Sequence, residues 1–379
     1  MTIAAAVWKS RTLSVNSTSL LSLYLVMPIL VLFVGWDTLF WNHQWRDRIL
    51  PQFPAEILIW SIVFNFPHIV SSLVTLADKA YWDFYRRRLI VGFSVIAASV
   101  LVINLLTPVL FGKQVTDLIF LVYFVFYAGY TVWHVLSQQF GIGLMLMRVT
   151  PQVRYYSMWR WLSTTAGTLM YVMVFGEVFF NDVQLFGVDV ERLLMVVALG
   201  FVVLASLVGA PLVIQSRRTL GSWYGVGNLA ILPVSYLMLL WGYPVFVVMI
   251  PRFIHDFTAF QVYAVHDHNR NREVAHNLVY RCLRWVPLTP LMLCPLVAIV
   301  LANSVECSTM WIDTLIGSSA TLPQKCLLEP AMALPLADRV PGSMALWLQV
   351  FFITGFFHYF IEGFVWKRES IHRHSVGFS

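Results

Sequence analysis

Residues 253–271, FIHDFTAFQVYAVHDHNRN, carry three histidines and two aspartates in and beside an apolar run long enough to cross a bilayer. Ionisable side chains are costly inside a membrane, and those found there usually have a function. Histidine can ligate a metal ion, and a nearby carboxylate can orient its ring or move protons. A metal site here would need further ligands, which the other histidines of the chain and the helices that carry them could supply.

The composition predicts an integral membrane protein. Of the 379 residues, 59% are hydrophobic and 12% are charged, whereas soluble proteins have about 25% charged residues. We expect one all-α, multi-pass integral membrane domain over residues 1–379, with about ten spans. The expected spans are 19–36, 56–77, 89–111, 117–147, 160–180, 192–214, 224–242, 244–266, 286–303 and 343–365. The net charge of +6 comes without any nucleic-acid-binding motif, so we expect no nucleic-acid partner.

The basic residues predict the orientation. With ten spans, 18 of the 25 Lys and Arg residues fall on the side that holds both termini, six fall on the other side, and Arg252 lies inside a span. Cytoplasmic loops carry an excess of Lys and Arg, so we expect both termini to be cytoplasmic, in an inner or plasma membrane. The longest outer loop, 304–342, contains Cys307 and Cys326. A disulfide between them is expected if this side is oxidising, with two free thiols as the alternative.

Four histidines lie at a similar depth in four different expected spans. His68, His134, His255 and His358 are between about seven and thirteen residues from the inner ends of their spans, which places all four in the inner half of the bilayer at ~1.5 Å rise per residue. A single buried histidine more often caps or bridges helices. Four at one depth favour a shared metal site, since imidazole suits Fe, Cu and Zn.

Polar companions follow these histidines at same-face helical spacing. Asn65 is three residues before His68, Gln138 is four after His134, Glu362 is four after His358, and His266 is eleven after His255. Glu362 and Asp256 are candidate catalytic groups that orient ligands or shuttle protons. His266 is a fifth candidate ligand, and Asn65, Gln138 and Arg252 are candidates for binding substrate.

Two of these assignments have plain alternatives. Arg252 and Asp256 are four residues apart and could simply pair with each other, in which case Arg252 does not meet a substrate carboxylate. Residues 266–276, HDHNRNREVAH, are polar and follow a span. We expect them to form a solvated loop rather than an interfacial helix, and this loop is the alternative to a metal role for His266.

Short elements of the sequence resemble the Brp/Blh family of membrane carotenoid-cleaving dioxygenases. These are FPH at 66–68, WH at 133–134, and the histidines late in the chain. The resemblance implies an all-helical membrane fold with iron held by histidines from separate spans, for which His68, His134, His255 and His358 are the matching positions. Membrane desaturases and hydroxylases are similar by analogy in using many histidines, although their HxxxH and HxxHH boxes are absent here.

The sequence thus predicts a membrane metalloenzyme, an iron-dependent oxygenase acting on a lipid-like molecule such as a carotenoid, isoprenoid, sterol or acyl chain. Copper, zinc or haem are the alternative cofactors. One rival function is a b-type haem or quinone protein with axial histidines. Another is a proton-coupled transporter that uses buried His, Asp and Glu as a relay. The expected partners are a lipid-soluble substrate and the membrane lipids.

Overall fold

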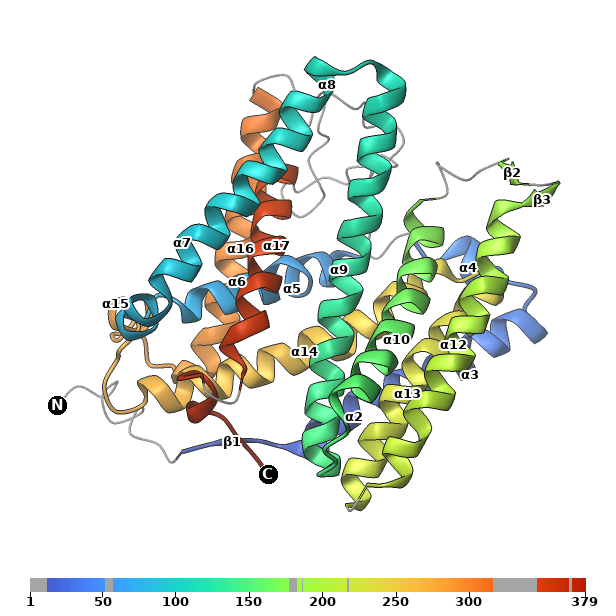
Figure 1. Cartoon of the computed structure of the whole chain (residues 1–379). Coiled ribbons are helices and arrows are strands. Elements are labelled where there is room, and N and C mark those ends of the chain that lie inside the picture. Colours follow the sequence, from blue (N-terminus) through green and yellow to red (C-terminus); the bar gives the residue numbers. More distant parts are fainter. Residues whose placement is uncertain are drawn as a thin grey trace. The chain divides into compact units, whose positions relative to one another are not determined.

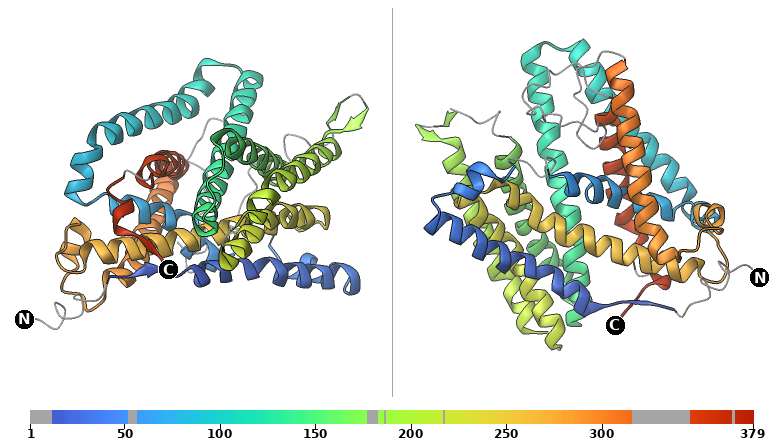
Figure 2. Two further views of the ribbon diagram at one scale, coloured as in Figure 1. Left: turned by 60° about the horizontal axis from the view of Figure 1, so that its bottom comes forward. Right: turned by 180° about the vertical axis from the view of Figure 1, so that it is seen from behind.

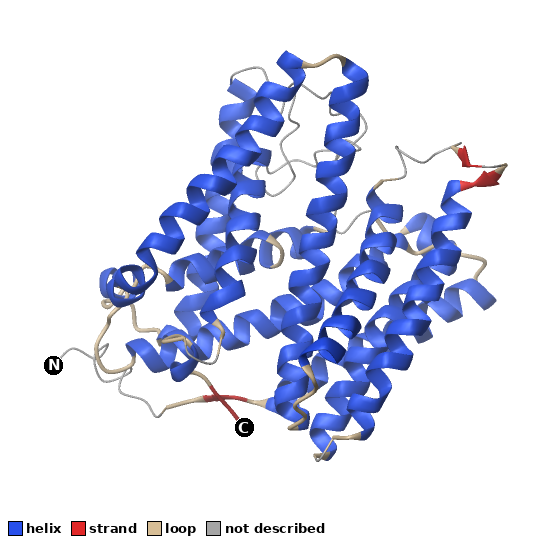
Figure 3. Cartoon of the chain, in the orientation of Figure 1, coloured by secondary structure: helices blue, strands red, loops and turns tan. Residues whose placement is uncertain are grey.

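The computed structural model describes residues 12–51, 57–176, 183–185, 187–216, 218–315, 346–367 and 370–379. Helices make up most of this part of the chain, and the four strands are only two residues long (Figure 3). The prediction of an all-α protein is confirmed. The elements are labelled in Figure 1.

Nine helical segments in the described residues are long and apolar enough to cross a membrane. They are Ser17–Phe40, Leu58–Thr75, Lys79–Leu106, Gln114–Met147, Val190–Ile214, Thr219–Leu240, Pro244–Asn271, Pro290–Asp313 and Leu346–Val365. Each corresponds to an expected span. The remaining expected span, 160–180, coincides with helix α10 (Val153–Phe175). Arg154 and Arg160 together with several Ser, Thr and Tyr residues make α10 less apolar than the other nine.

The described chain divides into two compact units. The first unit comprises residues 1–16, 58–120 and 256–379. Within it, α6 (Phe66–Thr75), α16 (Pro290–Leu315) and α17 (Leu346–Val365) lie side by side, and α17 also packs on α7 (Lys79–Leu101; Figures 1 and 2). The other elements here are α5 (Leu58–Val63), a π-helical turn Val102–Leu106, α8 (Thr107–Leu110), α15 (Leu278–Cys282) and a 3₁₀ turn Arg373–Ser375.

The two ends of the described chain meet within this unit. Strand β1 (Ser14–Val15) pairs in parallel with β4 (Gly377–Phe378). The side chain of Asn269 braces the pair, because its amide donates to the carbonyls of Leu13 and Ser375 at 2.8 and 2.9 Å. The segment after α17 is thereby held against the end of helix α14 (Pro244–Asn271).

The second unit comprises residues 17–57 and 121–255. Its core is formed by α10, α12 (Val190–Ile214) and α13 (Thr219–Leu240). It also contains α2 (Ser17–Ser22), a 3₁₀ turn Leu23–Leu25, α3 (Val26–Phe40), α4 (Gln44–Arg48) and the hairpin of β2 (Gln184–Leu185) with β3 (Val188–Asp189). Asp189 caps α12 by accepting from the backbone N–H of Glu191 at 2.8 Å, as a helix N-cap does.

Two long helices run through both units, because the unit boundaries fall inside them. These are α9 (Lys113–Met147), which contains His134, and α14 (Pro244–Asn271), in which the boundary separates His255 from Asp256. The turn before α14 matches the expected tight hairpin. Gly242 has φ +79°, a conformation that favours glycine, and Pro244 begins the helix, as proline commonly does.

Two of the expected loops differ in the structure. Residues 266–271 form the last turns of α14, with His266, Asp267 and His268 buried, instead of a solvated loop. The helix α16 extends to Leu315, well into the expected outer loop. Asp313 near its end is fully buried and accepts from the backbone N–H groups of Leu346 and Trp347 at 2.6 and 3.0 Å. A carboxylate there satisfies N–H groups that the start of α17 leaves unbonded. The predicted Cys326 lies outside the described residues.

Candidate metal centre

Helix α6 begins at a break in the second span, and this break positions His68. The expected continuous helix 56–77 is interrupted between α5 and α6, where Asn65 has φ +64°, a strained conformation for a residue with a side chain. Pro67 in the first turn of α6 suits a helix start. The break leaves the Asn65 carbonyl outside any helix, three residues before the fully buried His68.

Backbone and carboxylate acceptors fix the tautomer of His68. Its Nδ1 lies 2.7 Å from the carbonyl oxygen of Asn65 and 3.3 Å from Oδ1 of Asp256. Because a carbonyl can only accept, Nδ1 carries the proton and Nε2 keeps its lone pair. The other oxygen of Asp256 accepts from the N–H of Asn65 at 3.0 Å. Asp256 therefore supports both the histidine and the strained residue that orients it.

His358 on α17 is held in the same way. Its Nδ1 is 2.7 Å from Oγ of Ser72, and the Ser72 hydroxyl donates its one proton to the carbonyl of Ile69 at 2.7 Å. Ser72 must therefore accept from His358, which leaves Nε2 of His358 as the nitrogen with a lone pair. A carboxylate oxygen of Glu362 lies 3.6 Å from the same Nδ1. The His68 and His358 rings meet edge to face with centroids 4.9 Å apart.

The second unit contributes another histidine pair. His134 of α9 and His255 of α14 are 6% and 0% exposed, and their ring centroids are 5.0 Å apart at an interplanar angle of 80°. Arg252, three residues before His255, is also buried and lines an otherwise largely apolar pocket with Thr131 and Ser235.

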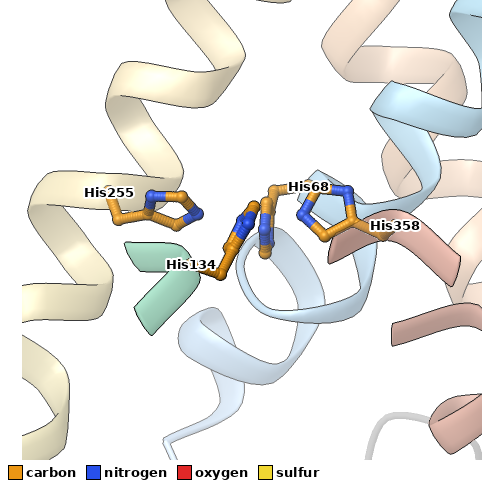
Figure 4. Close-up of side chains that lie close together, drawn as sticks. All are labelled: His68, His134, His255 and His358. Carbon is orange, nitrogen blue, oxygen red and sulfur yellow. The ribbon is translucent and has the colours of Figure 1, made fainter. Parts of the chain in front are cut away.

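All four histidines form one group that could hold a metal ion. Each ring offers a nitrogen, and the four nitrogens lie within 4.8 Å of one another (Figure 4). Metal–nitrogen bonds of ~2.0–2.1 Å place two ligand atoms on one ion up to about 4 Å apart, so small side-chain adjustments would bring them into ligating range. Within the part of the chain that the structure describes, no other group of three or more His, Cys, Asp or Glu side chains has a geometry that could hold a metal ion.

The other predicted site residues lie in different surroundings. Both nitrogens of His266 are engaged, Nδ1 with Asp267 at 2.8 Å and Nε2 with the Tyr81 hydroxyl at 2.9 Å. His266 is outside the four-histidine group, so we leave it out of the proposed site. Asn65 contributes backbone atoms to the site, and the side chain of Gln138 is half-buried.

Three residues at the site were missed by the sequence analysis. Ser72 orients His358 from another helix, and Tyr263 donates a hydrogen bond to Oε1 of Glu362. Trp366 donates from its indole N–H to the Tyr263 hydroxyl at 3.3 Å. Trp366 is four residues after Glu362, the spacing that revealed Glu362 itself, so the same pattern could have found it. Ser72 and Tyr263 gave no comparable signal, because their partners come from distant segments.

The comparisons with known proteins do not identify a family for this chain. Comparison of the chain with protein-family models, with curated proteins and with solved structures finds no match. The family resemblance drawn from its short motifs is therefore untested, and the chemistry of the four histidines must carry the functional argument.

Proposed function

We propose that this protein is a membrane-embedded metalloenzyme, an iron-dependent oxygenase that acts on a lipid-like substrate. The observation that carries the proposal is the buried group formed by His68, His134, His255 and His358. Intramembrane ionisable residues are rare and usually functional, and here four from separate spans converge.

The surroundings of His68 and His358 support a role as metal ligands. Ligating histidines almost always donate their second ring nitrogen to a carboxylate, a carbonyl or another acceptor. Here Nδ1 of His68 meets the Asn65 carbonyl and Nδ1 of His358 meets Ser72. Both rings would thus bind the ion through Nε2. Helix packing alone does not require two buried rings to share this protonation pattern.

Iron is the metal that best fits an oxygenase with this ligand set. Imidazole binds Fe, Cu and Zn alike, so the ligands by themselves leave the choice open. Iron held by these four imidazoles would supply O₂ activation. The b-type haem alternative is less well supported, because four nitrogens within 4.8 Å of one another leave little room for a porphyrin between axial ligands.

The two carboxyl groups beside the candidate ligands, Asp256 and Glu362, would have separate tasks. Asp256 holds His68 and the Asn65 turn in place through the contacts at 3.3 and 3.0 Å. Glu362 lies beside Nδ1 of His358 and is the group placed to take up or release a proton near the ligands. The site lies on apolar spans, so a hydrophobic substrate would reach it from the bilayer; a carotenoid, isoprenoid, sterol or acyl chain fits this description.

Metal analysis of the purified full-length protein tests the proposal. We expect about one iron per chain and no haem absorption band. Substituting any one of the four histidines by alanine should abolish stoichiometric metal, whereas His276→Ala, at an exposed position of the chain, should not. Oxygen uptake with a panel of the four lipid classes, followed by mass spectrometry of the products, identifies the substrate class.

Protein without any transition metal, or metal content unchanged in His358→Ala, would overturn the metal site. Stoichiometric zinc without iron or copper would keep the site but exclude the oxygenase. A haem spectrum that disappears in the histidine variants would favour the haem protein instead.

A further inference from the structure

A chain of side chains in contact, two of them oxidisable, leads from the candidate metal centre towards the protein surface within the first unit. Glu362 lies beside His358, the Tyr263 hydroxyl donates to Glu362, and the Trp366 indole donates to the Tyr263 hydroxyl. The rings of Tyr263 and Trp366 are in contact, with centroids 5.2 Å apart. Tyr263 is 2% exposed and Trp366 is half-buried, so the chain begins in the interior and ends at a side chain that is partly exposed at the protein surface.

The order of these side chains matches what one-electron transfer requires. Phenol and indole are the aromatic side chains that give up an electron most readily. A phenol loses its proton when it loses an electron, so an oxidised tyrosine is stabilised by an acceptor already bonded to its hydroxyl. Oε1 of Glu362 is that acceptor. The indole, which carries only a donor N–H, stands on the outer side of the phenol.

The alternative is that these contacts only pack α17 against α14. A buried tyrosine hydroxyl normally finds a hydrogen-bond partner, and that need would be met by any backbone carbonyl. A carboxylate is an expensive partner to bury. Packing alone does not explain why a buried carboxyl group lies between His358 and the Tyr263 hydroxyl, whereas a role in proton transfer does.

We propose that Tyr263 and Trp366 form a redox relay that carries one electron at a time between the surface and the histidine centre. With O₂ as the oxidant, Tyr263 would supply one electron to the histidine centre and pass its phenolic proton to Oε1 of Glu362. Trp366 then supplies an electron to the tyrosyl radical, which regains its proton from Glu362. A one-electron reductant in solution, such as ascorbate, restores Trp366. When no substrate is bound, electrons supplied through the relay would prevent oxidative damage to the four histidine side chains.

The physiological oxidant in this scheme rests on the proposed function, but electron transfer between Trp366 and Tyr263 does not. The relay is therefore tested in metal-free protein. Cys282 is an exposed free thiol on α15, two residues after Tyr280, and Tyr280 belongs to the buried cluster against which Trp366 packs. A ruthenium polypyridyl is attached to Cys282 in a Trp285→Phe background, because Trp285 is 77% exposed and only three residues from the label. The label is oxidised by a light flash with a quencher, Trp366 is the expected electron donor, and the radical formed is followed by transient absorption and by electron paramagnetic resonance.

We expect a neutral tyrosyl radical in this labelled chain and its loss in both Tyr263→Phe and Trp366→Phe. Glu362→Gln should reduce its yield, because the phenolic proton then has no carboxylate to go to. Tyr280→Phe is the matched control, since Tyr280 also donates to a buried carboxylate, that of Asp267, at 2.5 Å; this variant should keep the signal. Thermal unfolding of each labelled variant checks that it is folded.

A tyrosyl signal that survives in Tyr263→Phe, or that is lost in Tyr280→Phe, would overturn the relay. Survival in Trp366→Phe would do the same, because the electron would then bypass the indole. Since no metal is present in this experiment, its failure leaves the metal site standing, and a protein that shows the relay but binds no metal overturns the proposed function alone.

Discussion

Oγ of Ser72 lies 2.7 Å from Nδ1 of His358 and can only accept its proton, because the Ser72 hydroxyl donates to the carbonyl of Ile69. This relationship joins α6 to α17 and sets the nitrogen that His358 presents to the histidine group. It predicts that an uncharged, non-ligating side chain controls metal affinity.

Ser72→Ala should lower metal affinity by roughly 10- to 100-fold, the range for removing a partner of a ligating histidine. The loss follows because His358 would no longer be held in one tautomer and orientation. Competition with a chelator of known affinity measures it. Ser99→Ala is the control, as Ser99 is an exposed helical serine that bonds the carbonyl of Val95. Equal affinities in the two variants would mean that Ser72 does not orient a ligand.

Glu362→Gln should lower activity or metal content more than Glu273→Gln does. Glu362 is buried beside His358 and bonded to Tyr263, whereas Glu273 is exposed and forms an ion pair with Arg272 at 2.9 Å. Metal content by mass spectrometry and oxygen uptake provide the measurements, and indistinguishable variants would remove Glu362 from the site.

Acid should destabilise the protein through His372, in the segment after α17. Burial, together with the nearby His266 and Arg270, lowers the pKa of His372 from 6.5 to about 2. Between these values the unfolded chain binds a proton that the folded chain excludes. The free energy of unfolding therefore falls as the pH drops below about 6.5, by at most ~1.4 kcal/mol per pH unit for one group, and this group has no further effect above pH 6.5.

The His372 effect is measured by unfolding in detergent at a series of pH values. His372→Phe should flatten the decline below pH 6.5, because phenylalanine can keep the stacking on Tyr81, whose ring centroid lies 3.8 Å away, without binding a proton. His374→Phe, at an exposed position, should leave the decline unchanged. An unaltered pH profile in His372→Phe would assign the acid sensitivity to other groups.

Cys307 should remain protected from alkylation until the protein is reduced. It is disulfide-bonded, whereas Cys282 and Cys294 are free. The predicted partner is Cys326. Non-reducing mass spectrometry should recover a crosslinked peptide containing residues 307 and 326, while Cys282 reacts at once with a maleimide. Labelling of both Cys307 and Cys326 without a reductant would contradict the bridge and the oxidising environment that it implies.

Several features were predictable because they depend on composition and helical period. The apolar runs predicted the helices, including the unusually long α9, and the common depth of four histidines predicted the group that could bind a metal. The i, i+4 spacing placed Glu362 beside His358. These predictions rest on local patterns, which a helix converts directly into positions on its surface.

The fine structure of the site was decided by tertiary contacts. Pro67 favours a helix start near this point, but the strained conformation of Asn65 is not predictable from local sequence. The Asp256 carboxylate, distant in sequence, stabilises that turn by accepting the N–H of Asn65. The polar segment 266–271 has the composition of a loop. It remains helical and buried because Tyr81, Tyr280 and other side chains from separate segments satisfy its polar groups. Sequence alone determined which side chains the helices carry and at what depth; hydrogen bonding between segments far apart in the chain determined how those side chains are oriented.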